Sequence, residues 1–338
     1  MKVLITGGAG YIGSVTAEAL RHRGANIVVL DNLVYGHRAA VEDDVPFYLG
    51  SISDSNLIKR IVDEHSVDAC IHFAAYAYVG ESVTHPSKYF ENNLTQTVAL
   101  LDSLRELGVD KIVFSSTCAT YGEPKRIPID EAHPQWPVNP YGWSKFMIER
   151  VLEAYQTAYG LRFVSLRYFN AAGATAQLGE HHDPETHLIP NVLRAANSEF
   201  EYVSVFGNDY PTPDGTCIRD YIHVSDLADA HIRALDYLDD GGPSTQLNLG
   251  NGRGFSVLDV INAAEAVTGK SIRSKIESRR DGDPPQLIAD ASLANTTLGW
   301  TPALSDIEVI VRSAWEWKLA NPAGYGKSDG ELQITSAR

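Results

Sequence analysis

Residues 2–13 read Lys2-Val3-Leu4-Ile5-Thr6-Gly7-Gly8-Ala9-Gly10-Tyr11-Ile12-Gly13 and carry the clearest structural signal of the chain. Its first half is a short apolar run typical of a buried strand, and a helix is predicted from the glycines through Leu20. Gly7 and Gly10 let the backbone turn tightly and approach a pyrophosphate at the helix N-terminus, while Gly13 lets helix and strand pack closely. Strand, glycine turn and helix in this order predict a dinucleotide-binding site.

The next predicted strand covers residues 26–30, and Asp31 stands at its carboxyl end. A carboxylate in this place accepts hydrogen bonds from the ribose of an adenosine and repels a 2′-phosphate. We therefore expect NAD rather than NADP as the cofactor.

Apolar strand-like runs then alternate with helical stretches. The runs lie at residues 47–50, 68–73, 111–115 and 162–167, with one more at 246–249. This alternation predicts an α/β fold with a doubly wound parallel sheet of Rossmann type, whose active site lies at the carboxyl ends of the strands. The expected parts are an NAD-binding domain over 1–169, a smaller substrate-binding domain over 170–322, of which 219–252 return to the main sheet, and a mobile tail over 323–338.

The candidate catalytic pair is Tyr141 and Lys145, which lie about one helical turn apart and so face the same way. Asn139 is a good N-cap and Pro140 suits the first helical position, so a helix should begin just before Tyr141. Positive charge from the helix N-terminus and the lysine should lower the pKa of the phenol from its usual value of ~10. An ordinary pair of helix-surface residues is the alternative, and the neighbouring nucleotide site argues against it.

Composition excludes several classes of partner. The chain has 28 Lys and Arg against 43 Asp and Glu, a formal charge of −15, which argues against nucleic acid and anionic membrane surfaces. Cys70, Cys118 and Cys217 lack the spacing of a metal site or a disulfide framework. Because no secretory segment or bilayer-length apolar run is visible, we expect a cytoplasmic protein.

The glycine turn and the tyrosine–lysine pair belong to a longer series of motifs. The others are Phe73-Ala74-Ala75 with Val79-Gly80-Glu81-Ser82, residues 89–93 and 114–122, Leu166-Arg167-Tyr168-Phe169-Asn170, residues 206–212 and 219–224, and Arg279-Arg280-Asp281-Gly282-Asp283. In this order the motifs resemble those of the UDP-glucose 4-epimerase family, a group of extended short-chain dehydrogenases/reductases. The resemblance runs from Lys2 to about Pro322.

The resemblance implies an isomerase that interconverts UDP-galactose and UDP-glucose on tightly held NAD. Tyr141 would take the proton of the sugar 4-hydroxyl as the C4 hydride leaves, Lys145 would bind the nicotinamide ribose, and Thr117 would hydrogen-bond the 4-oxygen. The 4-keto sugar would then turn and take the hydride back on its other face. The residues expected at the cofactor are Gly7, Gly10, Tyr11, Ile12, Gly13, Asp31, Asn32, Ser51, Ile52, Phe73, Ala74, Ala75, Asn92, Ser115, Tyr141, Lys145, Tyr168 and Phe169.

The substrate is expected to be held through its UDP half, because the sugar must turn. Arg219 and Arg280 would clamp the diphosphate, since a guanidinium pairs with phosphate oxygens in a bidentate way. Leu287 stands where this family gates the sugar pocket, and its intermediate size predicts weak or partial use of UDP-N-acetylglucosamine. The residues expected at the substrate are Thr117, Tyr141, Asn170, His187, Leu188, Phe206, Arg219, Tyr221, Arg280, Asp283 and Leu287.

Three positions depart from the family pattern. Ala77 stands where many members have a lysine that reaches the cofactor, and Ser51 where an aspartate usually meets the adenine amino group. His187 replaces an asparagine that touches substrate, although a neutral imidazole can still donate one hydrogen bond. We therefore expect NAD to be held less tightly than is usual in the family.

A polar loop raises the question of a metal ion. Its residues of metal-binding type are His181, His182, Asp183, Glu185 and His187. Pro184 disrupts a regular helix, so the i, i+4 geometry of a helical zinc motif is unavailable, and hydride transfer needs no Lewis acid. We expect a polar loop over the substrate and no metal.

Competing functions differ in the residues that they need. A nucleotide-sugar 4,6-dehydratase would need an Asp-Glu pair just after Thr117, where Cys118 and Ala119 stand instead. A 4-epimerase acting mainly on UDP-N-acetylglucosamine, UDP-xylose, UDP-arabinose or UDP-glucuronate uses the same catalytic residues and stays open. A non-catalytic NAD-sensing regulator would have no use for the threonine, tyrosine and lysine together.

Helices predicted at 89–107 and 140–159 carry apolar residues beyond those that one core face needs. They resemble the pair of helices through which members of the family dimerise. We therefore expect a homodimer.

Overall fold

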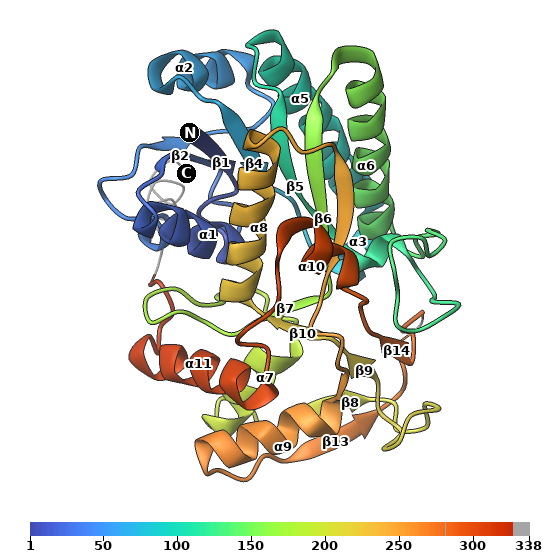
Figure 1. Cartoon of the computed structure of the whole chain (residues 1–338). Coiled ribbons are helices and arrows are strands. Elements are labelled where there is room, and N and C mark those ends of the chain that lie inside the picture. The colour runs from blue at the N-terminus through green and yellow to red at the C-terminus, as the bar shows by residue number, and fades with distance from the viewer. Residues whose placement is uncertain (281, 327–338) are drawn as a thin grey trace.

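The computed structural model describes residues 1–280 and 282–326 of the chain. Its larger part is a seven-stranded parallel sheet with helices on both faces (Figure 1), which confirms the predicted fold class. The strand order is β11-β6-β5-β4-β1-β2-β3. The strands are β1 (Lys2–Thr6), β2 (Asn26–Asp31), β3 (Phe47–Leu49), β4 (Ala69–His72), β5 (Lys111–Thr117), β6 (Arg162–Tyr168) and β11 (Thr245–Leu249).

Both faces of this sheet are covered because its strands are apolar on both sides. In β1, Val3 and Ile5 pack on one face and Leu4 on the other, as the two-residue period of a strand requires. The helices of the first face are α1 (Tyr11–His22) and α8 (Val224–Asp239), and those of the second are α2 (Ser55–His65), α5 (Gln96–Glu106) and α6 (Pro140–Tyr159). Since the strands are parallel, their carboxyl ends meet along one edge.

A smaller body, built mostly from residues after Asn170, lies below that edge in Figure 1. Its core joins helices α7 (Leu188–Ala196), α9 (Val257–Thr268) and α11 (Ile307–Ala320) to the parallel pair β8 (Val203–Phe206) and β13 (Ser274–Glu277). Shorter strands are β7 (Asn170–Ala172), β9 (Ile218–Arg219), β10 (Tyr221–His223), β12 (Phe255–Ser256) and β14 (Gln286–Leu287). Helix α10 (Ser292–Leu298) packs instead on α8 and β11 of the main sheet.

The chain passes between the two bodies several times. After β10 it returns to the main sheet through α8 and β11, which pairs with β6. The predicted division at residue 169 stays a prediction. Of the predicted tail, Tyr325 packs on His37 with ring centroids 5.0 Å apart, and its hydroxyl donates to the carbonyl of Gly179. Residues 327–338 lie outside the described residues.

The predicted helix over residues 89–107 is broken into pieces. Helix α4 (Pro86–Tyr89) runs into a π-helical stretch, η2 (Phe90–Thr95), before α5 begins. The other short helices are η1 (Arg38–Ala40), α3 (Val79–Thr84) and η3 (Cys118–Thr120).

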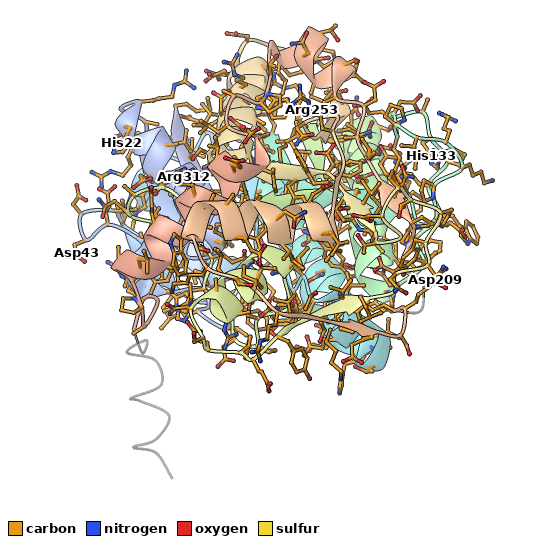
Figure 2. All side chains as sticks on the ribbon, turned by 90° about the horizontal axis from the view of Figure 1, so that it is seen from below. His22, Asp43, His133, Asp209, Arg253 and Arg312 are labelled. Atoms are coloured by element: carbon orange, nitrogen blue, oxygen red, sulfur yellow. The ribbon has the colours of Figure 1, made fainter. Side chains whose placement is uncertain are left out.

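Among the charged side chains, Asp43 and Asp209 are exposed and lie near opposite edges of the view in Figure 2. In the described part of the chain, no helix has both the length and the apolar character needed to cross a bilayer. The three cysteines are buried and form no disulfide.

Asp220 ties together segments that are far apart in the sequence and should matter for stability. Its carboxylate is fully buried and accepts backbone N–H groups from Asn251 at 2.8 Å and from Gly252 and Ala289 at 3.1 Å each. Burial raises its pKa to about 7. In Asp220→Asn the amide NH₂ must face at least one of these donors, so we expect the free energy of unfolding to fall by about 1–3 kcal/mol in urea titrations.

The matched control is Asp306→Asn, an exposed N-cap whose carboxylate accepts the Glu308 N–H at 3.0 Å. Asparagine caps a helix about as well as aspartate, so this change should stay within about 0.5 kcal/mol. Equal effects of the two substitutions would contradict the importance of the buried carboxylate.

Candidate active site

A cavity of about 1650 Å³ lies along the carboxyl edge of the sheet and reaches into the smaller body. This volume exceeds the ~300–1,000 Å³ of a typical small-molecule site, so two ligands fit. The predicted cofactor residues in its wall are Gly7, Gly10, Tyr11, Ile12, Gly13, Asp31, Asn32, Ile52, Phe73, Ala74, Ala75, Asn92, Ser115, Tyr141, Lys145, Tyr168 and Phe169. The predicted substrate residues in its wall are Thr117, Tyr141, Asn170, His187, Leu188, Phe206, Arg219, Tyr221, Arg280, Asp283 and Leu287.

Ser51 is the one predicted site residue that does not line the cavity, although its neighbours Gly50 and Ile52 do. Its hydroxyl hydrogen-bonds that of Ser53 at 2.8 Å and donates to the Gln96 side chain at 3.2 Å. Gln96 lies in the cavity wall instead. In the chain alone, the side chain of Gln96 therefore takes the place in the cavity wall that was predicted for Ser51.

The glycine turn has the shape that a diphosphate requires. Gly7 has a φ of +72°, which favours glycine, and a Cβ on Gly13 would lie 2.2 Å from the carbonyl oxygen of Gly7. Helix α1 has no side-chain cap at Gly10 and no acidic residue in its first turn. The first N–H groups of the helix are therefore free at the cavity wall, in a turn too tight for larger residues at Gly7 and Gly13, and this arrangement fits the phosphates of NAD.

Gly13→Ala tests the cradle. The added Cβ would overlap the Gly7 carbonyl, and the displaced turn should weaken NAD binding by about 10²-fold, measured by isothermal titration. The control is Gly80→Ala, whose Cβ would meet no atom within 4 Å. Unchanged NAD affinity in Gly13→Ala would contradict the assigned role of the turn.

Asp31 ends β2 and keeps its carboxylate at the cavity. One of its oxygens accepts the backbone N–H of Ala9 at 2.9 Å and the other that of Leu33 at 2.8 Å. Burial raises its pKa, while these backbone donors act in the opposite sense. The carboxylate is thus fixed in place, and each oxygen keeps a lone pair for a ribose hydroxyl.

The catalytic candidates meet where β5 and α6 approach each other. Helix α6 begins at Pro140 as predicted, and Asn139 caps it by accepting the N–H of Gly142 at 2.8 Å. Lys145 is buried and donates from Nζ to the carbonyl of Ser115 at 2.8 Å. Thr117 ends β5, where its hydroxyl oxygen accepts the Ala119 N–H at 3.2 Å.

The expected lowering of the phenol pKa is wrong for the chain alone. Burial raises the pKa of Tyr141 well above its usual value, and the nearby Thr117 hydroxyl only partly opposes this shift. Burial also lowers the pKa of Lys145 to about 7, against the attraction of Glu149. The sequence shows that a lysine and a helix N-terminus are near, but it does not show how completely the pair is desolvated.

The substrate side carries two arginines. Arg219 forms an ion pair with Asp283 and donates from Nη1 to the carbonyl of Ile218 at 2.7 Å. The guanidinium of Arg280 lies over the ring of Phe206, 4.0 Å from its centroid. Both arginines and the aromatic ring therefore stand together in the wall, as an anionic nucleotide would require.

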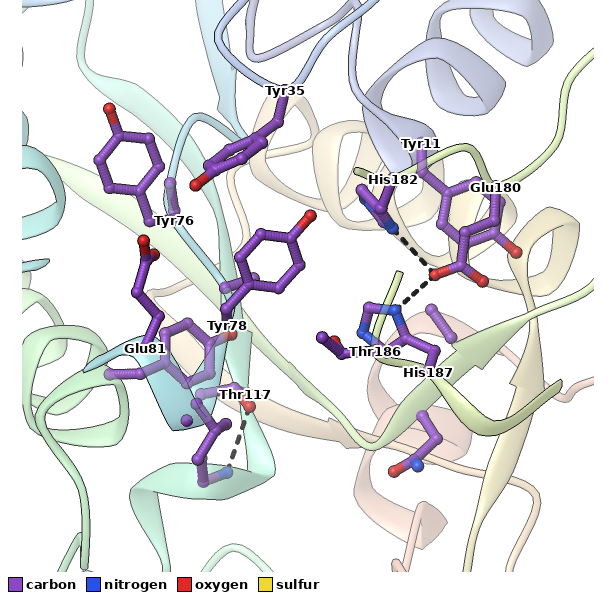
Figure 3. Close-up of a pocket in the computed structure, with 18 of the residues that line it drawn as sticks. Tyr11, Tyr35, Tyr76, Tyr78, Glu81, Thr117, Glu180, His182, Thr186 and His187 are labelled. Carbon is purple, nitrogen blue, oxygen red and sulfur yellow. Dashed lines mark hydrogen bonds and ion pairs between the residues drawn. The ribbon is translucent and has the colours of Figure 1, made fainter. Parts of the chain in front are cut away.

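Sequence reasoning missed part of the wall. Figure 3 shows Tyr35, Tyr76 and Tyr78 on one side of the cavity and Glu180 between His182 and His187 on the other. Glu180 precedes the histidines directly in the sequence, and this adjacency could have drawn attention to it. The tyrosines carry no such signal, because their grouping depends on the tertiary fold.

A parallel sheet with a glycine turn and a tyrosine–lysine pair at one cavity defines an NAD-dependent enzyme of the extended short-chain dehydrogenase/reductase class. The model of the NAD dependent epimerase/dehydratase family matches residues 3–250. The chain belongs to this family.

Similar proteins agree with this assignment. A UDP-glucose 4-epimerase from Halalkalibacterium halodurans is 51% identical over 335 residues, which cover 98% of this chain and 100% of that protein. The crystal structure of UDP-glucose 4-epimerase from Brucella ovis in complex with NAD is 48% identical, with a TM-score of 0.91 over 93% of this chain and 97% of that one. The enzyme from Bifidobacterium longum in complex with NAD+ and UDP is 39% identical, with a TM-score of 0.91 over 96% and 100%. The resemblance to UDP-glucose 4-epimerases is confirmed.

Proposed function

We propose that the chain catalyses the reversible 4-epimerisation of UDP-galactose and UDP-glucose with NAD as cofactor. One observation carries the proposal: a single cavity joins the glycine turn, the Tyr141–Lys145 pair with Thr117, and the arginines of the smaller body. Its size fits a dinucleotide and a nucleotide sugar together. Relatives named UDP-glucose 4-epimerase match this chain over nearly their whole length, which supports the proposal.

The residues divide the chemistry among them. Bound NAD would supply a reversible acceptor for the C4 hydride, which returns to the other face of the 4-keto sugar, and, when oxidised, a positive charge. The Tyr141 phenolate accepts the proton of the sugar 4-hydroxyl and returns it after the 4-keto sugar has turned, so protons balance over the cycle. Thr117 holds the 4-oxygen, and the Lys145 ammonium stabilises the phenolate. Because burial alone raises the phenol pKa, the base has to form in the presence of the charged ligands.

Turnover of UDP-galactose by the purified chain tests the proposal. Formation of UDP-glucose is scored without added NAD and again with NAD supplied. We expect product in the second assay, and a dependence on added NAD would show weak retention, as Ala77 and Ser51 predict. No product in either assay would overturn the proposal.

Leu287 bears on which UDP-sugars the cavity can accept. It lies on β14, lines the cavity and packs against the cluster of Cys118 and Phe169. We propose that it admits UDP-N-acetylglucosamine only partly, so the rate with this sugar should fall well below that with UDP-galactose. UDP-xylose, assayed in parallel, separates a pentose-sugar preference from a hexose one.

We propose that two chains associate through α6 and the segment of η2 and α5, which contact each other. Met147 and Tyr159 of α6 are exposed, at 36% and 57%, and support such an interface. Sedimentation analysis of the full chain distinguishes a dimer from a monomer. We also propose that the protein works in the cytoplasm, where its UDP-sugar substrates would be available.

A further inference from the structure

We propose that Glu180, His182, Glu185 and His187 form a binding site for one divalent transition-metal ion of the zinc type. The four residues belong to the loop before α7 and line the cavity beside the glycine turn. The structure departs here from the sequence expectation, because loop residues meet without the helix that a regular zinc motif would use. Glu180 takes part, whereas His181 and Asp183 do not.

The four side chains bring nitrogen and oxygen donor atoms close together, at present as hydrogen-bonded pairs. One donor atom from each residue lies within 4.8 Å of all the others. His187 Nδ1 lies 2.7 Å from Glu180 and 2.9 Å from Glu185, and His182 Nδ1 lies 3.1 Å from Glu180. Tetrahedral zinc with bonds of ~2.0–2.1 Å requires donors roughly 3.3 Å apart, so small rotations of the side chains suffice.

The charge of the cluster also calls for a cation. The side chains of Glu180 and Glu185 are only 8% and 5% exposed. Among residues 1–280 and 282–326, no lysine or arginine lies at ion-pair distance from either carboxylate, and histidines are their only basic partners. Buried charges are otherwise paired or bound to metals, and a divalent ion balances two carboxylates beside neutral imidazoles. Two nitrogen donors favour zinc-type ions over magnesium or calcium.

A second observation is independent of the cluster. Tyr78 is 8% exposed, and its hydroxyl has no hydrogen-bond partner among the described residues. Its ring stands edge-on to that of His182 at 6.0 Å, and Figure 3 shows it extending towards this histidine. A buried hydroxyl without a partner indicates that a bound ligand accepts its hydrogen bond. A water or hydroxide bound to the metal ion would provide this acceptor.

The alternative is a metal-free network in which the histidines are protonated and pair with the glutamates. A measurement of zinc binding distinguishes the metal site from this metal-free network. The full chain is treated with EDTA, dialysed against ZnCl₂ and analysed for bound metal by mass spectrometry, and the same titration is followed by calorimetry. We expect one zinc per chain, and a visible spectrum of four-coordinate cobalt when Co²⁺ replaces it.

Two variants test whether these residues are the ligands of the ion. Glu180→Gln/Glu185→Gln keeps side-chain volume and His182→Ala removes one nitrogen donor, and each should weaken zinc binding by at least about 10–100-fold. His181→Gln is the control, since His181 stacks on His37 outside the cluster. Circular dichroism confirms folding, and zinc should raise the melting temperature of the parent and the control alone. Absence of stoichiometric zinc in the parent, or equal binding by parent and variants, overturns the site.

Discussion

Replacing Tyr141 with phenylalanine should lower the turnover of UDP-galactose by about 10²–10⁴-fold, the range in which general acid–base groups contribute. The change removes one oxygen atom and leaves the ring in its place on the first turn of α6. Folding and NAD binding should therefore stay close to those of the parent. The rate is measured as UDP-glucose formed at saturating substrate, because the loss should appear in kcat rather than in KM.

Tyr155→Phe is the matched control on the same helix. Its hydroxyl donates to Asp102 at 2.9 Å, and it does not line the cavity. This variant should turn over UDP-galactose at nearly the parental rate. Turnover by Tyr141→Phe within a few-fold of this control would rule the phenol out as the base.

Local signals predicted most of the fold. The strand and glycine turn at residues 2–13 and the cap at Asn139 act within a few residues, so sequence alone places β1, α1 and the start of α6. The π-helical stretch over Phe90–Thr95 was not predictable in this way. Its side chains continue a helical pattern, and nothing in them marks the wider turn, which lies against α6 in the fold.

The sequence predicted some residues of the site correctly and missed others. Residues fixed by a motif, such as Asp31 and Lys145, lie in the cavity wall as expected. Ser51 turns instead to Ser53 and Gln96, because a short hydroxyl finds partners close by. For the chain alone, burial raises the pKa of Tyr141 where a lowering was predicted, since the desolvation of a side chain is a property of the assembled fold. Glu180 joins the histidines only when the loop is folded.

Arg167→Leu should lower the free energy of unfolding by about 3–5 kcal/mol, because it removes the buried two-bond partner of a buried carboxylate and leaves it only a longer ionic contact of 3.7 Å to the 44% exposed side chain of Arg150. Arg167 on β6 donates to both oxygens of Glu149 on α6, from Nε at 2.9 Å and from Nη2 at 2.7 Å. The two side chains are 3% and 0% exposed. The Ser116 hydroxyl donates to the same carboxylate at 2.6 Å, but a neutral donor cannot balance its charge. Urea unfolding measures the loss.

A second substitution shows why the loss is large. Arg167→Leu/Glu149→Leu removes the stranded charge as well, so the double variant should regain part of the stability that the single variant loses. The control is Arg126→Leu, which breaks the ion pair between Arg126 and Asp130. The side chains of these two residues are 48% and 42% exposed. Such a surface pair contributes at most about 1 kcal/mol. If Arg167→Leu costs no more than this control, the pair does not stabilise the contact between α6 and β6. Glu149 lies about one helical turn beyond Lys145 on α6. A small effect of Arg167→Leu would therefore also mean that this ion pair does not fix the position of Lys145.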